Sequence, residues 1–321
     1  MFGKLSLASL LVLTLLALIA DNPLRAAEKI KFGTAVKMFN PYYLPMLAAE
    51  EKGFWQKNGL EVEWVPFRGA PLMDRAMTTG HLDIGAGVTT TFIRTAEKGL
   101  PAVMVAEVER YMEFFVWVMA NRPIKEVKDL RGTKIGVVSM ASISHDFGKV
   151  IAEKHHLEKD IKFVGTGGLV EGVAALRTGA IDADIVAPFA SVIKLTLEGV
   201  LRKVVGTRQY LPKEWIDLPL IARKDFIRDK PETARKAVKT FLEGVKFAQR
   251  NESWSLDKIK SFAGVSQEVA AWLIKYYPLT ENGKIDRKGV ENVRSFLIGH
   301  GLVSADKTPP VDELYTNEFV S

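Results

Sequence analysis

The sequence predicts an α/β protein with two doubly wound lobes, each built around a parallel sheet. Segments that alternate like strands follow segments with apolar residues at helical spacing, and this order produces parallel sheets with right-handed crossovers. The order occurs twice, and each copy contains a similar stretch, "MTTGHLDIGAG" at 77–87 and "LRTGAIDADIV" at 176–186. The 321 residues are enough for two cores, because a single core usually stops growing near about 250–300 residues.

The N-terminal residues are typical of a secretory signal peptide. Lys4 is followed by an apolar run over 5–20 whose only polar residues are Ser and Thr. This run is shorter than the about 20 apolar residues of a membrane span. We predict that residues 1–27 are the signal, that cleavage follows "RAA", and that the mature chain is exported.

The composition is that of an ordinary globular protein, with 47% hydrophobic and 26% charged residues and no cysteine. The lack of cysteine excludes disulfides, a lipid-anchored N-terminal cysteine and cysteine-based chemistry. The formal net charge is +6, and loss of Lys4, Arg25 and Asp21 with the signal leaves +5. This charge suits an anionic ligand or membrane surface, and it equally serves solubility. No cluster of basic and aromatic residues predicts a nucleic-acid partner.

Glycines mark the ends of both predicted helices in the first copy. Gly59 and Gly80 each follow a helical pattern, where a residue free to adopt positive φ ends a helix. The expected elements are a strand at 29–36, a helix at 42–59, a strand at 60–67, a helix at 70–80 and a strand at 81–87.

The second copy repeats these elements in the same order. They are a strand at 133–140, a helix at 144–157, a strand at 161–166, a helix at 168–179 and a strand at 180–187. Gly80 therefore corresponds to Gly179, and Asp83 corresponds to Asp182. We interpret the two Asp residues as hydrogen-bonding the turns that enter the strands, on the side away from a ligand, and not as a catalytic pair.

The remaining segments predict how the chain passes between the lobes. Extended runs at 101–108 and 114–120 precede the second copy, and 114–120 is a candidate for crossing between the lobes. Another extended run at 218–227 follows the second copy. Helices are then expected at 231–250, 256–277 and 287–300. The predicted division is a discontinuous first lobe, 28–118 and 217–321, and a second lobe, 119–216.

Ligands of open α/β sheets bind beyond the carboxyl ends of the strands, where helix N-termini expose N–H groups. In the first lobe the candidates at these positions are Phe39, Asn40, Tyr42, Tyr43, Arg68, Gly69, Thr89, Thr90 and Glu107. Each type has a structural alternative. The aromatic residues can pack a helix start, the arginine can be an exposed loop residue, the threonines can cap a helix, and Glu107 can pair with Arg110.

The second lobe offers a serine-rich loop after its first strand. Ser142 and Ser144 are placed to cap a helix that begins near His145, and the N–H groups of such a helix attract an anionic group. His145 fits a ligand contact and a structural role on the first helical turn equally well. The candidates of this lobe are Ser139, Ala141, Ser142, Ser144, His145, Gly168, Pro188 and Phe189.

The sequence does not favour a catalytic or metal site. Ser142 or Ser144 with His145 lacks a GxSxG elbow and a third triad member. The pair His155-His156 has no further ligand at metal-binding spacing. We therefore predict no catalytic residue, no metal and no cofactor.

Four stretches carry a resemblance to a known family. They are "PYYLPMLAAEEKGFWQKNGLEVEWVPFRG", "AMTTGHLDIGAGVTTTFIRTAEKGLPAVMVA", "VKDLRGTKIGVVSMASISH" and "VDELYTNEFV". Together they resemble the periplasmic solute-binding proteins of the NMT1/THI5-like and sulfonate, taurine and nitrate group, over nearly the whole mature chain. The resemblance implies the type II periplasmic binding protein fold, in which two lobes are joined by a hinge.

The resemblance also implies a function. A periplasmic protein of this family closes on a small polar or anionic molecule, such as a sulfonate, nitrate, an aromatic carboxylate or a pyrimidine-type compound. It delivers the molecule to the permease and ATPase subunits of an ABC importer, and we expect this chain to act as a monomer. Sulfonate-binding members carry Gly-Ser-Ser-Ala-His in the second lobe, whereas residues 141–145 here read Ala-Ser-Ile-Ser-His. Ile143 replaces a hydroxyl, which departs from the sulfonate pattern.

Two alternatives from other classes remain open. The first is an enzyme of the pyrimidine-precursor type on the same fold, although that branch of the family relies on a Cys-rich motif that this chain lacks. The second is the effector-sensing domain of a regulator, which requires a DNA-binding helix-turn-helix where this chain has its predicted signal peptide.

Overall fold

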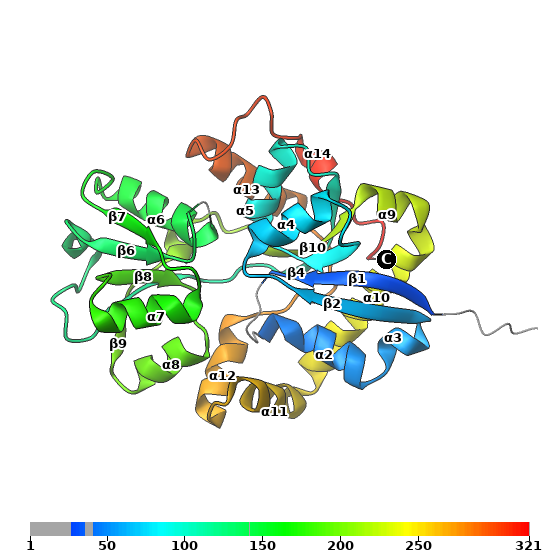
Figure 1. Cartoon of the computed structure of the whole chain (residues 1–321), viewed down its shortest axis with the longest axis horizontal. Helices are drawn as coiled ribbons and strands as arrows, with labels where there is room; N and C mark the ends of the chain where they lie inside the picture. The colour runs from blue at the N-terminus through cyan, green and yellow to red at the C-terminus, as the bar shows by residue number, and fades with distance from the viewer. Residues whose placement is uncertain (1–26, 36–40, 141, 321) are drawn as a thin grey trace, which may run out of the picture.

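Two five-stranded sheets, each with helices on both faces, lie side by side in the computed structural model (Figure 1). The structure describes residues 27–35, 41–140 and 142–320. Residues 1–26 of the predicted signal peptide and the site candidates Phe39, Asn40 and Ala141 lie outside the described residues. The predicted fold of two doubly wound α/β lobes is confirmed.

The first sheet has the strand order β2-β1-β3-β10-β4. β1 pairs in parallel with β2 and β3, whereas β10 runs antiparallel between β3 and β4. The strands are β1 (Glu28–Thr34), β2 (Leu60–Pro66), β3 (Ile84–Ala86), β4 (Ala102–Glu109) and β10 (Leu218–Arg223). All eight residues of β4 are buried, as expected of a strand that is covered on both faces.

The second sheet repeats this arrangement in the order β7-β6-β8-β5-β9. β6 is parallel to β7 and β8, and β5 runs antiparallel between β8 and β9. The strands are β5 (Phe115–Met119), β6 (Lys134–Val137), β7 (Lys162–Gly165), β8 (Ala183–Val186) and β9 (Leu201–Gly206).

Helices cover both faces of the first sheet, with α4, α5 and α13 on one side and α2, α3 and α10 on the other (Figure 1). α10 begins with Pro231, has Glu232 in its first turn and ends at Arg250, which suits the helix dipole. The helices and 3-10 turn of this lobe are η1 (Pro41–Tyr43), α2 (Leu44–Glu51), α3 (Phe54–Lys57), α4 (Ala70–Thr78), α5 (Thr89–Glu97), α9 (Lys224–Asp229), α10 (Pro231–Arg250), α13 (Arg287–Gly299) and α14 (Val311–Leu314).

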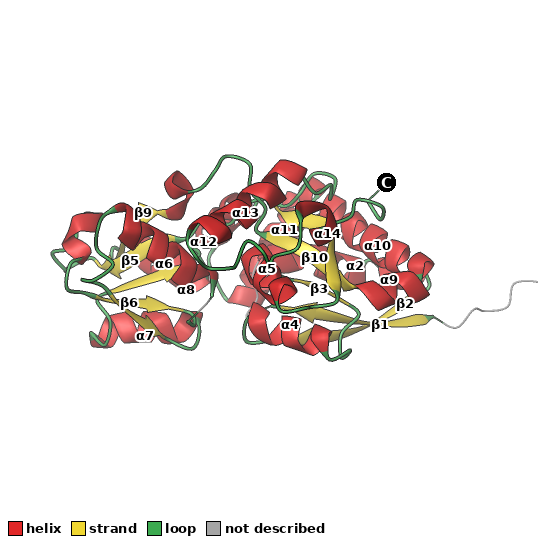
Figure 2. Ribbon diagram, turned by 90° about the horizontal axis from the view of Figure 1, so that it is seen from above, coloured by secondary structure: helices red, strands yellow, loops and turns green. Residues whose placement is uncertain are grey.

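The second lobe carries its own helices and also contacts helices from the C-terminal part of the chain. Figure 2 shows α12 and α13 lying toward the boundary between the two sheets, and α12 packs on α8. The helical elements of the second lobe itself are η2 (Val127–Leu130), α6 (Ile143–Lys154), α7 (Leu169–Thr178), α8 (Ala190–Leu197) and η3 (Thr207–Tyr210). The C-terminal part of the chain adds α11 (Glu252–Ala263) and α12 (Gln267–Tyr276).

Three local expectations differ from the structure. The run at 114–120, expected to cross between the lobes, forms β5 in the interior of the second sheet, where its apolar residues are buried. The run at 218–227 is β10 followed by the start of α9. The helix expected at 256–277 is two helices, because Gly264 adopts a φ of 64° and the Ser266 hydroxyl caps α12. The helices α5 and α8 and the strand β9 had not been predicted as elements.

The two similar stretches of sequence form the same local structure. The Lys31 N–H donates to the Asp83 carboxylate at 2.9 Å, and the Lys134 N–H donates to the Asp182 carboxylate at 3.0 Å. Each Asp thus ties the entrance of its own strand, β3 or β8, to the neighbouring strand, β1 or β6. The interpretation of this pair as structural is confirmed, although each partner lies on the adjacent strand and not in the turn itself.

An arginine completes each copy of this arrangement. Arg223 pairs with Asp83 at 3.5 Å, and Arg122 pairs with Asp182 at 3.8 Å. A Cβ on Gly80 would lie 2.7 Å from Arg223 Nη1, and a Cβ on Gly179 would lie 3.3 Å from Arg122 Nη2. Both glycines also have positive φ, 77° and 75°. The Thr-Gly pair therefore ends a helix and leaves room for the arginine.

A buried carboxyl group lies in the core of the second lobe. Asp184 is 0% exposed, and neither of its side-chain oxygens has a hydrogen-bond partner in the described part of the chain. Gly136 and Gly172 make space for it, since a Cβ on Gly172 would lie 2.2 Å from Asp184 Oδ2. Burial raises the pKa of Asp184 to about 7.

Replacing this group should change how stability depends on pH. The folded-state pKa of Asp184 is about 7 and lies above the unfolded value of about 3.9, so the carboxyl group destabilises the fold increasingly as the pH rises between these values. We expect the stability gained by Asp184→Asn to be about 2–3 kcal/mol larger at pH 8 than at pH 5. Urea unfolding of both proteins at the two pH values measures this difference, and a gain that does not change with pH contradicts it.

Candidate functional site

Two segments carry the chain between the lobes, one between β4 and β5 and one between η3 and β10, and they are hydrogen-bonded to each other. The Asp217 N–H donates to the Arg110 carbonyl at 3.1 Å. The Asp217 carboxylate accepts from the Met112 N–H at 2.6 Å and from Trp215 Nε1–H at 2.7 Å. Burial raises the pKa of Asp217 to about 7, and these two donors act in the opposite direction.

The N-terminus of α5 joins this crossing point. The Thr89 N–H and hydroxyl both donate to the Asp217 carbonyl, at 2.9 and 3.2 Å. The neighbouring Thr90 is 1% exposed, and its hydroxyl has no hydrogen-bond partner among the residues that the structure describes. Of these two predicted site residues, Thr89 therefore hydrogen-bonds to the crossing segment that contains Asp217. The Thr90 hydroxyl makes no hydrogen bond within the described residues.

The serine hydroxyls of the second lobe form hydrogen bonds within their own loop. The Ser142 hydroxyl donates to the Ser139 carbonyl at 2.6 Å and lies 3.0 Å from the Ser144 hydroxyl. The Val138 N–H donates to the Ser144 hydroxyl at 3.0 Å. Ser142 occupies the N-cap position of α6, but its side chain makes no cap hydrogen bond. The expected side-chain cap is therefore absent, because these hydroxyls find closer partners within the loop.

His145 and Gly168 stand at the starts of neighbouring helices of the second lobe. The half-buried His145 ring meets Phe163 edge to face, with centroids 5.2 Å apart. Burial lowers the pKa of His145, and the positive charges of Lys149 and Arg94 lower it further. Gly168 is the N-cap residue of α7. The Gly168 carbonyl accepts a hydrogen bond from the Thr166 hydroxyl at 3.0 Å.

The loop after β8 reaches the other lobe. Pro188 and Phe189 are buried, and the Tyr277 hydroxyl donates to the Pro188 carbonyl at 2.8 Å. Tyr277 directly follows α12 and is 3% exposed. This hydrogen bond brings a phenol ring from the C-terminal part of the chain against a predicted site loop of the second lobe.

Tyrosines and a carboxyl group gather where β4 ends. Tyr42 is 4% exposed, and its ring centroid lies 4.6 Å from that of Tyr43. Burial raises the pKa of Tyr42 well above its usual value, and Tyr43, Tyr277 and Glu109 add to this shift. Burial also raises the pKa of Glu109 well above its usual value, and the negative charge of Asp217 raises it further.

Arg68 and Gly69 lie at the start of α4. Arg68 is exposed, and Gly69 is the N-cap residue with a φ of 123°. The Gly69 N–H donates to the Ala35 carbonyl at 2.8 Å. The backbone of this pair is therefore tied to the end of β1, the strand that precedes the first predicted site loop.

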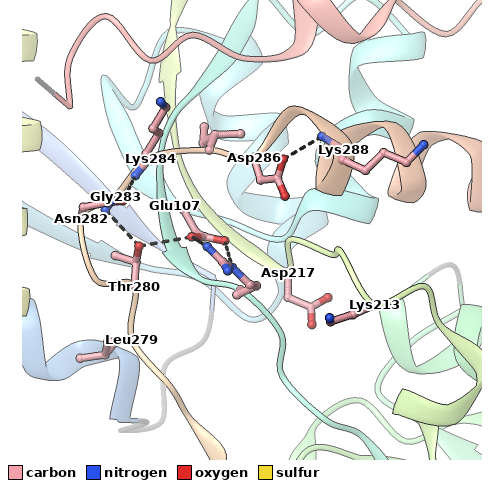
Figure 3. Close-up of polar contacts among 12 residues, drawn as sticks. Glu107, Lys213, Asp217, Leu279, Thr280, Asn282, Gly283, Lys284, Asp286 and Lys288 are labelled. Atoms are coloured by element: carbon pink, nitrogen blue, oxygen red, sulfur yellow. Dashed lines mark hydrogen bonds and ion pairs between the residues drawn. The ribbon is translucent and has the colours of Figure 1, made fainter.

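Glu107 lies on β4, the strand at one edge of the first sheet. Its carboxylate accepts from Arg110 Nε and Nη2 and from the Thr280 hydroxyl, each at 3.3 Å (Figure 3). The Thr280 hydroxyl in turn accepts from the Gly283 N–H at 3.0 Å. The Glu107 N–H donates to the Gly283 carbonyl at 2.7 Å, so the segment around Thr280 covers the strand edge. These partners account for Glu107 without a ligand, and its place in the site stays a prediction.

Ion pairs also connect the lobes. Arg94 of α5 pairs with Asp146 of α6, whose side chain is 0% exposed. Burial raises the pKa of Asp146, and the Arg94 guanidinium lowers it. His300, which follows α13, lies 2.5 Å from the Glu153 carboxylate of α6.

Elements of the two lobes meet at Pro188 and Tyr277 and at Arg94 and Asp146, and the role of the predicted residues in binding stays a prediction. Tyr277, Arg94, Asp146 and Glu109 were not among the site residues predicted from the sequence. Glu109 carries a local signal, since it stands two residues after Glu107 at the end of a predicted strand. Tyr277 carries none, because only the course of the C-terminal helices brings it to the second lobe.

The described residues form neither a metal-binding cluster nor a helix that could span a membrane. Among the described residues, no group of three His, Asp or Glu side chains is arranged to hold a metal ion. Within the same residues, no helix is both long and apolar enough to cross a bilayer.

Comparison with known proteins gives a family match and a sequence relative. The family model described as NMT1/THI5 like matches residues 40–253. A protein of Brucella abortus (strain 2308), provisionally named a binding protein, is 26% identical over 222 residues, which are 68% of this chain and 67% of that protein.

Solved structures share the fold over almost the whole chain. A protein from Bordetella bronchiseptica RB50 is 25% identical with a TM-score of 0.77, and the match covers 92% of this chain and 96% of that one. The periplasmic aliphatic sulphonate binding protein of Escherichia coli is 19% identical with a TM-score of 0.72, covering 92% and 99%. The chain therefore has the fold of periplasmic binding proteins.

Breaking the pair between α5 and α6 should destabilise the protein. Arg94→Met leaves the buried Asp146 carboxylate without its cation, and we expect the free energy of unfolding to fall by about 2–4 kcal/mol. Adding Asp146→Asn should recover part of this loss, because a neutral amide is less costly to bury than a charge. Urea denaturation at pH 7 compares the two variants, and equal losses in both would count against a buried charge pair.

Proposed function

This chain belongs to the NMT1/THI5-like family, and on that basis we propose that it is the solute-binding protein of an ABC importer. Its ligand is a small polar or anionic organic molecule held between the two lobes. The protein is exported to the periplasm, acts as a monomer and delivers its ligand to the permease and ATPase subunits of the importer.

The observation that carries this proposal is the meeting of loops from both lobes at one boundary. The residues that follow β3 and β4 in the first lobe and β8 in the second converge there, and the hydrogen bond from Tyr277 to Pro188 spans the two sides. Binding at the carboxyl ends of strands is the rule for open α/β sheets. A ligand that contacts both lobes favours their closed arrangement, which is how a hinged protein signals that it is occupied.

Hydroxyl and backbone N–H groups support a polar or anionic ligand. The Thr90 hydroxyl has no partner in the described structure, and it lies on the first turn of a nine-residue helix. On the other side, α6 starts without a side-chain cap. Helix starts of this kind favour negative or acceptor groups.

The bonding of the serine loop supports binding over catalysis. The Ser142 hydroxyl donates to a backbone carbonyl at 2.6 Å. A serine nucleophile would instead donate to a histidine base that a third group orients. An enzyme of the pyrimidine-precursor type on the same fold is the alternative that a test of turnover must address.

A panel of small molecules tests the function. The purified exported protein is heated with sulfonates, nitrate, aromatic carboxylates or pyrimidines, and a true ligand should stabilise it by about 2.7 kcal/mol at a hundredfold excess over Kd. The same mixtures are analysed for chemical change. Consumption of a panel member would support the enzyme alternative and contradict the proposal.

A matched pair of threonine variants tests the place of binding. Thr90→Val removes an uncommitted buried hydroxyl at the lobe boundary, and it should weaken the ligand found in the panel by about tenfold because one hydrogen bond is lost. Thr240→Val removes another buried hydroxyl without a partner among the described residues, on α10 in the first lobe. Titration calorimetry should find its affinity unchanged, and equal effects of the two variants would argue against binding at the boundary.

A further inference from the structure

Glu109 is a buried acid whose bonding capacity is unused. It ends β4 at the lobe boundary and is 0% exposed. Neither carboxyl oxygen has a hydrogen-bond partner within the described residues. Buried polar groups in native proteins almost always have partners, so a group of this kind calls for an explanation such as a missing ligand.

Among the described residues, an acid and a phenol interact electrostatically with Glu109. Asp217 faces it from the second crossing segment, and its negative charge raises the pKa of Glu109. Tyr42 approaches from η1 and interacts electrostatically with Glu109 and with Tyr277, which follows α12. The backbone of Glu109 also pairs with that of Leu279, two residues after Tyr277. An anionic ligand group placed here would meet two carboxyl groups, whereas a hydrogen-bond donor would find acceptors.

The two neighbouring acids are not equivalent. The Asp217 carboxylate already accepts from Met112 N–H and Trp215 Nε1–H. Glu107, on the same strand as Glu109, is likewise satisfied by Arg110 and Thr280. Glu109 is therefore the member of this group that is left to bind something else.

We propose, building on the proposed binding function, that Glu109 binds an N–H-bearing group of the ligand: an amine, amidine or amide nitrogen. The ligand then has two unlike ends. Its donor end lies in the first lobe against Glu109, and a polar or anionic end faces the helix starts of the second lobe.

Burial without a partner does not by itself make a binding group, and the chain contains a case for comparison. Asp184 is equally buried and equally unpaired, but it lies within β8 in the core of the second lobe, against Gly136 and Gly172. Glu109 differs in its position, because its backbone pairs with that of Leu279, two residues after Tyr277, whose hydroxyl bridges to the second lobe. Asp184 therefore supplies the matched control.

Isosteric pairs of probes test the proposal. Benzamidine is compared with benzoate, and nicotinamide with nicotinate, so that each pair differs in donor or anionic character at nearly constant shape. We expect the wild-type protein to bind the N–H-bearing member of a pair more tightly. Glu109→Gln should weaken that binding by roughly 10- to 100-fold, and Asp184→Asn should leave it unchanged.

Proton release provides a second readout that a structural role would not produce. Burial and Asp217 raise the pKa of Glu109, and a cation held against its carboxylate would lower this pKa again. Binding of cationic benzamidine should therefore release protons, and its affinity should rise with pH by at most about tenfold per unit. Calorimetry in two buffers of different ionisation enthalpy should detect the released proton in the wild type and in Asp184→Asn, but not in Glu109→Gln.

The outcomes separate this inference from the proposed function. Binding of benzoate, nicotinate, sulfonates or nitrate with no response to Glu109→Gln would overturn the inference and leave the binding function standing. Failure of every probe of both kinds to bind would count against both. If Glu109→Gln does not unfold cooperatively, the test is proton release by the wild-type protein when benzamidine binds. If no proton is released, the inference is overturned.

Discussion

The hydrogen bonds of one buried carboxylate, Asp217, set the relation between the two lobes. Asp217 joins the two crossing segments through Met112 and Arg110, and its carbonyl holds Thr89 at the start of α5. A change in the angle between the lobes must therefore be absorbed by a few residues on either side of this point, as in other hinged proteins.

Equivalent positions in the cores of the two lobes are filled by different residues. By the correspondence of the repeated stretches, Gly33 and Gly136 match, as do Gly85 and Asp184, and Met73 and Gly172. In the first lobe a Cβ on Gly85 would lie 3.1 Å from Met73 Sδ, so the helix supplies the large side chain. In the second lobe the helix supplies a glycine and the strand supplies Asp184. One larger side chain fills this position in each lobe, but in the second lobe a carboxyl group replaces a thioether and makes the core sensitive to pH.

The ionisable groups on the two sides of the lobe boundary have different surroundings. On the first-lobe side, Glu109 and Asp217 are buried acids whose pKa values are both raised, and Glu109 also interacts with the Tyr42 phenol. On the second-lobe side, the His145 pKa is lowered by burial and by nearby positive charges. A ligand with a donor at one end and an acceptor at the other suits this asymmetry better than a simple symmetric anion does.

The sequence by itself determined the fold class, the repeat and the structural role of Asp83 and Asp182, because these depend on local periodicity, on helix-ending glycines and on short-range bonding at strand entrances. It also placed most site candidates on the loops after the strands. It could not show that 114–120 is an interior strand, since an apolar run does not reveal its partners. Nor could it separate Glu107 from Glu109, which differ only in what lies opposite them: Arg110 and Thr280 for the first, no hydrogen-bond partner in the described structure for the second. That difference, like the arrival of Tyr277 at Pro188, was decided by tertiary structure. It depends on where segments distant in the chain come to lie, since Thr280 is 173 residues from Glu107 and Tyr277 is 89 residues from Pro188.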